Sequence, residues 1–216
     1  MKRTALGLTL IAAISAAACL QKDTTSTIYL RPDGSFDWVA LERNVRSDEA
    51  DAGMRQAEEV GYADEVNRGE HDIVNGLLAL GAEDVEVRWL RSRRPYAVMI
   101  DARFDSLAGV FGRMVSSCGI PFESAMAESD GVKTWTFRAD VGVDGGRLSD
   151  IDSDCVLNSD GLDDLLDGLR IVLESGTFMA ATGFILHGKD TVEADDEAMQ
   201  ECAKTTGIIE LSLSWR

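Results

Sequence analysis

Several short segments of this chain alternate strictly between apolar and polar residues, and this alternation constrains the fold more than any other feature. In residues 84–90 three apolar side chains alternate with charged ones, and residues 96–104 and 134–141 follow the same period of two. That period is typical of β-strands that bury one face and expose the other, as in antiparallel sheets. The chain is therefore predicted to contain half-buried antiparallel strands.

Turn-forming residues group these strands into hairpins. Proline restricts φ and glycine tolerates positive φ, so such residues between two alternating runs predict a turn. The hairpins predicted in this way lie at residues 27–45, 84–104 and 121–141, with turns at 32–35, near Pro95 and at 129–131. Further strands are predicted at residues 170–175, 181–187 and 209–215.

Between the hairpins, the apolar period changes to that of a helix. In residues 106–118, apolar side chains fall at i, i+3, i+4, i+7, i+8 and i+11, which places them on one helix face. Helices are also predicted at residues 47–66, 70–80, 162–169 and 195–204. This order predicts an α+β fold, in which antiparallel hairpins form a sheet covered on one face by amphipathic helices. One domain is expected over residues 27–216, with the Gly- and Asp-rich loop 142–161 as an alternative sub-boundary.

The first nineteen residues resemble the signal of a bacterial lipoprotein. Lys2 and Arg3 precede an uncharged apolar run of about fourteen residues, which is typical of a secretory signal and too short to span a bilayer. The small residues 16–18 before Cys19 resemble a lipobox, the motif after which the signal peptide is removed. The resemblance implies a signal peptide at residues 1–18 and a Cys19 that carries fatty-acyl chains such as palmitate. An ordinary cut before Cys19, which would leave this cysteine to a disulfide, is the alternative.

The residues after Cys19 bear on where the protein would be held. Residues 19–26 are short and mostly polar, so they are predicted to form a lipidated cysteine and a flexible tether. In Gram-negative lipoproteins, Leu20 in place of aspartate implies the periplasmic face of the outer membrane. The resemblance thus implies an exported protein of the cell envelope, anchored to a membrane by lipid.

The formal net charge of the chain is −17. Such a charge disfavours binding to nucleic acid or to anionic lipid surfaces, and it favours solubility and cationic partners. Against this background, four arginines within seven residues stand out near the tip of the second hairpin. They are a candidate patch for a carboxylate, a phosphate headgroup or an envelope protein, or they pair with neighbouring acids: Arg88, Arg91, Arg93 and Arg94.

An acidic loop offers candidate calcium ligands. An EF-hand counted from Asp150 is excluded, because Cys155 stands where glycine is required and Gly161 where glutamate is required. An irregular calcium site remains as a hypothesis beside a simple solvated loop, and no other cofactor is predicted. The residues concerned are Asp150, Asp152, Asp154, Asn158 and Asp160.

Three cysteines follow Cys19. A bridge between Cys118 and Cys155 would close a loop of about 38 residues and add roughly 4 kcal/mol on the chain-entropy model. Cys202 would then be a buried free thiol on the apolar face of its helix. Pairing of Cys155 with Cys202 is the alternative.

No catalytic motif marks the chain as an enzyme. It contains no G-x-S-x-G, HExxH or CxxC spacing. Residues 183–190 do not match the phosphate-binding loop motif, because Asp190 stands where that motif has the Ser or Thr that binds magnesium. These observations favour a binding or interaction domain over a hydrolase that uses unmarked carboxylates. A calcium-stabilised module is a third hypothesis.

Two stretches resemble LppM-like envelope lipoproteins. Residues 174–196 share with that group a strand, a small-residue-Gly pair, a polar Gly turn and a second strand, and residues 27–38 look like its opening hairpin. The resemblance covers about 35 residues and implies a domain that engages envelope lipids or other envelope components. It assigns no site residue.

Overall fold

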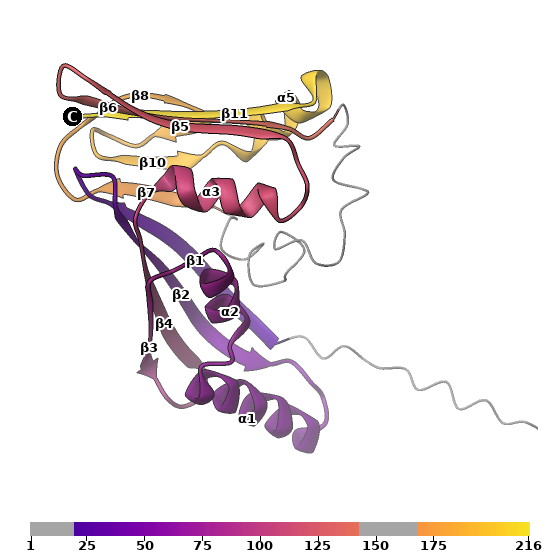
Figure 1. The fold of residues 1–216 in the computed structure, drawn as a ribbon. Helices are drawn as coiled ribbons and strands as arrows, with labels where there is room; N and C mark the ends of the chain where they lie inside the picture. Colours follow the sequence, from indigo (N-terminus) through magenta and orange to yellow (C-terminus); the bar gives the residue numbers. More distant parts are fainter. Residues whose placement is uncertain (1–19, 143–167) are drawn as a thin grey trace, which may run out of the picture.

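The computed structural model of the chain describes residues 20–142 and 168–216, which form two β-sheets (Figure 1). The larger sheet has seven strands in the order β3-β4-β2-β1-β7-β10-β9. Its strands are β1 (Leu20–Leu30), β2 (Phe36–Ser47), β3 (Asp84–Arg91), β4 (Tyr96–Phe104), β7 (Arg170–Leu173), β9 (Phe184–Leu186) and β10 (Thr191–Ala194).

The smaller sheet has four strands in the order β5-β6-β11-β8. They are β5 (Phe122–Ser129), β6 (Val132–Asp140), β8 (Phe178–Thr182) and β11 (Ile208–Trp215). The helices of the described residues are α1 (Ala52–Arg68), α2 (Asp72–Ala79), α3 (Leu107–Ser116) and α5 (Asp196–Thr206).

The α+β fold class is confirmed. Neighbouring strands pair antiparallel except β1 and β7, which run parallel. The three predicted hairpins are present as β1–β2, β3–β4 and β5–β6. Their division between two sheets, with helices between and beside them, differs from the single covered sheet that the alternation predicts.

The helices of the described residues match the sequence pattern with one shift, and the helix predicted at residues 162–169 lies largely outside these residues. Ser106 caps α3, because its hydroxyl accepts the N–H of Gly109 at 3.2 Å. Helix α1 begins at Ala52 instead of near Ser47, because the Asp51 carboxylate accepts the N–H groups of Gly53 and Met54 and caps the helix there. Ser47 is instead the last residue of β2.

Residues 20–26, predicted as a flexible tether, form the first part of β1. They pair with β2 from Leu20 opposite Ser47 to Ser26 opposite Ala40. The segment is polar, yet it is held by side chains of β2: the buried Ser26 hydroxyl accepts the Trp38 indole N–H at 2.6 Å. Residues 20–26 therefore belong to β1.

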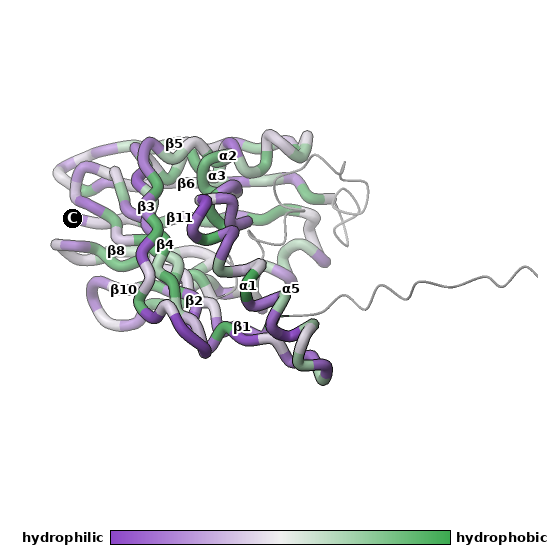
Figure 2. Tube along the Cα trace, turned by 90° about the horizontal axis from the view of Figure 1, so that it is seen from below, coloured by the Kyte–Doolittle hydropathy of each residue, from purple (hydrophilic) through white to green (hydrophobic). Residues whose placement is uncertain are grey.

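The helices place the core on one face of each sheet. Helices α1 and α2 pack on β2, β3 and β4, whereas α3 packs on β5 and β6. Figure 2 shows α2 and α3 as mainly hydrophobic and α1 as largely hydrophilic, in keeping with the greater exposure of α1. Helix α5 packs beside β11, where Met199 contributes to the core.

A single glycine connects the two sheets between β8 and β9. Gly183 has a φ of +74°, and a Cβ atom there would lie 2.4 Å from Leu211 Cδ2 and 3.1 Å from the carbonyl oxygen of Glu210. The chain leaves the four-stranded sheet at Thr182 and enters the seven-stranded sheet at Phe184. The bend therefore needs both the left-handed conformation and the missing side chain.

We expect Gly183→Ala to destabilise the fold more than Gly188→Ala. Both glycines have positive φ, at which a side chain costs about 1–2 kcal/mol, but no atom lies within 4 Å of a Cβ at Gly188. Only the change at Gly183 adds a steric clash to this cost. Urea unfolding of both variants measures the difference, and equal losses would contradict the close packing at the bend.

Candidate functional site

A fully buried carboxylate, Glu42, lies on the helix-covered face of β2. Its Oε1 accepts from Lys22 Nζ at 2.8 Å, and its Oε2 accepts from the Tyr62 hydroxyl at 2.7 Å. His71 Nε2 lies 3.1 Å from the same Oε2. These contacts join β1, β2, α1 and the start of α2 through one side chain.

His71 has two contacts in this cluster. It caps α2, and its Nδ1 accepts the N–H of Ile73 at 3.2 Å. Its Nε2–H donates to Glu42 Oε2. The imidazole thus satisfies a helix end and a buried acid together.

The surroundings of Glu42 keep it ionised. Burial by itself raises the pKa of its carboxyl, but the hydrogen bond and charge of His71, together with the charge and hydrogen bond of Lys22, outweigh burial and hold the pKa at about 2. Burial and the neighbouring Glu42 charge raise the pKa of Tyr62. Because the Glu42 carboxylate is buried and both of its oxygens are paired, it links β1, β2, α1 and the start of α2 and is not accessible to a substrate.

The cluster was not predicted from the sequence, although one feature of the sequence indicates it. Alternate residues of β2 face the core, and in this series Glu42 follows Phe36, Trp38 and Ala40. A glutamate at a core position requires buried partners. The partners themselves lie 20 and 29 residues away in the chain, so spacing does not reveal them.

The structure divides the four arginines of the second hairpin. Arg88 lies within β3 and pairs with Asp101 on β4, with Nη2 3.4 Å from Oδ2. Arg94 pairs with Glu59 of α1, with Nε 3.0 Å from Oε1. Arg91 and Arg93 are exposed at the hairpin tip and form no ion pair with any residue of the described ranges. Only this pair keeps the free guanidinium groups that headgroup binding requires.

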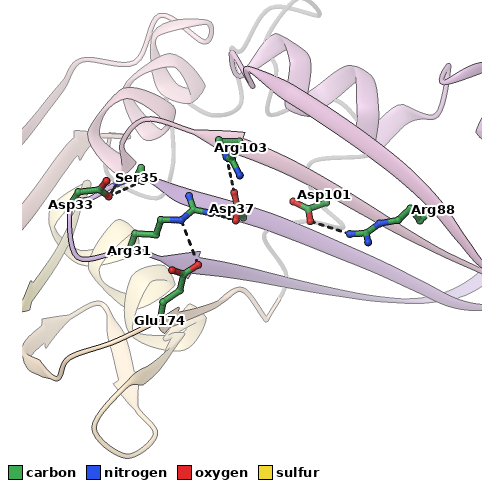
Figure 3. Close-up of polar contacts among 8 residues, drawn as sticks. All are labelled: Arg31, Asp33, Ser35, Asp37, Arg88, Asp101, Arg103 and Glu174. Atoms are coloured by element: carbon green, nitrogen blue, oxygen red, sulfur yellow. Dashed lines mark hydrogen bonds and ion pairs between the residues drawn. The ribbon is translucent and has the colours of Figure 1, made fainter.

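A row of ion pairs crosses the outer face of the seven-stranded sheet (Figure 3). Asp37 on β2 contacts both Arg31 and Arg103, and Arg31 Nε lies 3.5 Å from Glu174. Partial burial and the nearby Asp37 raise the pKa of Asp101, which Arg88 partly offsets. These partly exposed pairs contribute below about 1 kcal/mol each. Each of these two acids, Asp37 and Asp101, is paired with an arginine.

An apolar cavity of about 240 Å³ lies between α3, α5 and the two sheets. Every residue that lines it is apolar, including Phe111, Met114, Phe137, Phe184 and Leu211. Ligand pockets usually occupy about 300–1,000 Å³ and contain a few polar groups that orient the ligand. By size and chemistry this cavity is a gap between packed layers.

A shallow groove of about 740 Å³ crosses the four-stranded sheet. It is lined by hydroxyl groups and by an ion pair in which Arg138 Nε lies 3.2 Å from Glu210 Oε1. Its volume lies within the usual range for ligand sites, and its groups can exchange hydrogen bonds with a polar ligand. The hydroxyl groups belong to Ser124, Thr136, Thr182 and Ser212.

The cysteines differ in part from expectation. Cys118 is disulfide-bonded, and its partner lies outside the described residues. Cys202 is a free, exposed cysteine, so its predicted burial is wrong and so is its alternative pairing with Cys155. The apolar pattern of the helix predicted a buried Cys202, but α5 packs only part of its apolar face against β11, and Cys202 lies outside that part.

Other predicted site residues fall outside the described ranges. These are Cys19, Cys155 and the calcium candidates Asp150, Asp152, Asp154, Asn158 and Asp160. Within residues 20–142 and 168–216, no group of three or more His, Cys, Asp or Glu side chains could hold a metal ion. In the same ranges no helix has the length and apolar character needed to cross a membrane.

Comparisons with known proteins found only a weak similarity. No protein-family model matches it, and no curated protein matches it. Among solved structures it is similar to the folded domain of LppM from Mycobacterium tuberculosis, with a TM-score of 0.35 and 12% identity over 90% of this chain and 89% of that one. A similarity this low carries no conclusion about function.

We expect Glu42→Gln to destabilise the domain by about 3 kcal/mol at neutral pH, because Lys22 and His71 lose their anionic partner. A lowered carboxyl pKa contributes stability above the unfolded value of 4.5, and this contribution is lost as the pH falls toward about 2. The difference between wild type and variant should therefore shrink as the pH falls through this window. Urea unfolding at a series of pH values measures it.

Glu86→Gln is the matched control, since Glu86 is exposed and lies 3.8 Å from Arg88. We expect it to change stability by less than about 0.5 kcal/mol. A Glu42→Gln effect as small as this, or one independent of pH, would contradict the role assigned to the buried cluster.

We expect non-reducing peptide mapping to link Cys118 to Cys155 and to find Cys202 alkylated without reduction. The exposed Cys202 thiol is accessible to the reagent. A reduced and alkylated sample serves as the control. A link between Cys118 and Cys19 would overturn both the pairing and the lipidation of Cys19.

Proposed function

We propose that this chain is a lipid-anchored protein of the bacterial cell envelope whose folded domain binds an envelope component. The sequence of residues 1–19 carries the proposal: two cations, a short apolar run, and three small residues directly before Cys19. In a Gram-negative cell, Leu20 favours the periplasmic face of the outer membrane. The proposed activity is binding and not catalysis.

The groove of the four-stranded sheet is the surface that best supports a binding role. It combines a volume within the usual ligand range with hydroxyl groups and the Arg138–Glu210 pair. A ligand rich in hydrogen-bonding groups fits this chemistry better than an apolar one. The all-apolar cavity beneath the sheet is smaller and offers no such groups.

Intact mass of the protein recovered from its native host tests the anchor. We expect a mature chain that begins at Cys19, carries the added mass of a diacylglycerol, and enters the detergent phase on partition. The Cys19→Ser variant should lose the acyl mass and the detergent partition while it keeps the unfolding transition of the domain. A mature chain that begins at Cys19 without acyl mass would contradict the proposal.

Photo-crosslinking in living cells tests the groove. A photoreactive amino acid at Thr136 lies in the groove, and one at the exposed Tyr29 lies on the outer face of the other sheet as a control. We expect a specific adduct from position 136 and none from position 29. Equal adducts at both positions, or none at 136, would contradict binding in the groove.

A further inference from the structure

The folded domain begins one residue after the predicted lipid attachment site. Leu20 is the first residue of β1 and pairs with Ser47, the last residue of β2. Consecutive Cα atoms are about 3.8 Å apart, so a lipid on Cys19 would be attached one residue from the described end of β1.

The start of β1 is held firmly in the sheet. Lys22 is joined to the buried Glu42 at 2.8 Å, and pairing with β2 extends to Leu20. Freeing this segment to act as a tether would break the buried ion pair, which is strongly destabilising. A lipid on Cys19 therefore fixes which end of the molecule meets the membrane.

The same end of the sheet carries the tip of the β3–β4 hairpin. Val45 near the end of β2 pairs with Tyr96 at the start of β4, which places the turn 92–95 at the same end of the sheet as the start of β1, with β2 between them. Helix α1 packs against this end through the contact of Glu59 with Arg94. Figure 1 shows α1, the β3–β4 tip and the start of β1 at the end of the molecule remote from the four-stranded sheet.

The side chains exposed at this end suit a membrane surface. Arg91 and Arg93 are exposed at the hairpin tip and have no ion pair with a described residue. Leu90 and Met54, on β3 and α1, are 57% and 51% exposed. At physiological salt the screening length is about 8 Å, so these local cations act on nearby phosphates despite the net negative charge of the chain.

We infer that the end of the seven-stranded sheet formed by Leu20, Ser47 and the 92–95 turn rests directly on the membrane that holds the anchor, with Arg91 and Arg93 against lipid phosphates. The inference rests on the lipid anchor of the proposed function. It assigns the domain one orientation, in which the β1–β2 turn is far from the bilayer. Lys133 of the four-stranded sheet donates to the carbonyl of Asp33 in that turn at 3.0 Å. The groove is thus presented away from the membrane.

Depth-dependent quenching tests this orientation on the full, acylated chain. In a Cys202→Ser background, a fluorophore is placed on Ser92→Cys at the hairpin tip or on Lys189→Cys. Lys189 is exposed and lies at the opposite end, beside Phe178 of the four-stranded sheet. The protein is reconstituted in vesicles of phosphatidylcholine and phosphatidylglycerol that contain a spin-labelled lipid.

We expect strong quenching at position 92 and little at position 189. Acyl mass with equal quenching at both positions would overturn the orientation and leave the anchor intact. A preparation without acyl mass would overturn the anchor and the orientation together. Intact mass measured on the same sample therefore distinguishes the two failures.

Charge variants test the arginine contacts. Each arginine at an anionic surface favours the docked state by about fivefold. Arg91→Gln with Arg93→Gln should therefore reduce quenching at position 92 in phosphatidylglycerol vesicles and leave it unchanged in pure phosphatidylcholine. The control is Lys204→Gln with Lys189→Gln, two exposed cations away from this end. Equal loss in both pairs would overturn the role of Arg91 and Arg93.

Discussion

The buried pair of Glu42 and Lys22 is the interaction on which the rest of the arrangement depends. It holds the polar first residues of β1 in the sheet, and through Tyr62 and His71 it also fastens α1 and α2 to the same face. A buried acid is costly unless every partner is in place. The start of β1 and the two helices are therefore coupled, and this coupling determines where a lipid on Cys19 would attach the domain.

The two sheets extend this constraint to the far end of the molecule. The chain passes between them at Gly183, where only a glycine fits, and α3 contributes side chains to the apolar space between the layers. The four-stranded sheet is thereby held at the β1–β2 turn, opposite the end where β1 begins. The end that we propose to meet the membrane therefore lies opposite the end that carries the groove.

The candidate sites were only partly predictable. The run from Arg88 to Arg94 is visible in the sequence, but cross-strand and helix contacts occupy Arg88 and Arg94 and leave Arg91 and Arg93 free. For the Glu42 cluster, the sequence showed a glutamate at a core position but did not indicate its partners. The groove could not be predicted from the sequence, because Thr136, Thr182 and Ser212 come from three strands whose pairing no local pattern encodes.

The sequence by itself determined the local elements of this protein: hairpins at period two, the helix within residues 106–118, and the turns at 32–35 and 129–131. These depend on neighbours within a few residues, where side-chain periodicity and backbone preference act directly. Only the tertiary structure decided that residues 20–26 are a strand, that the hairpins divide between two sheets, and that the start of β1 lies at the same end of the sheet as the arginine tip. Those outcomes depend on contacts between distant residues, whose free energy is realised only when the layers pack.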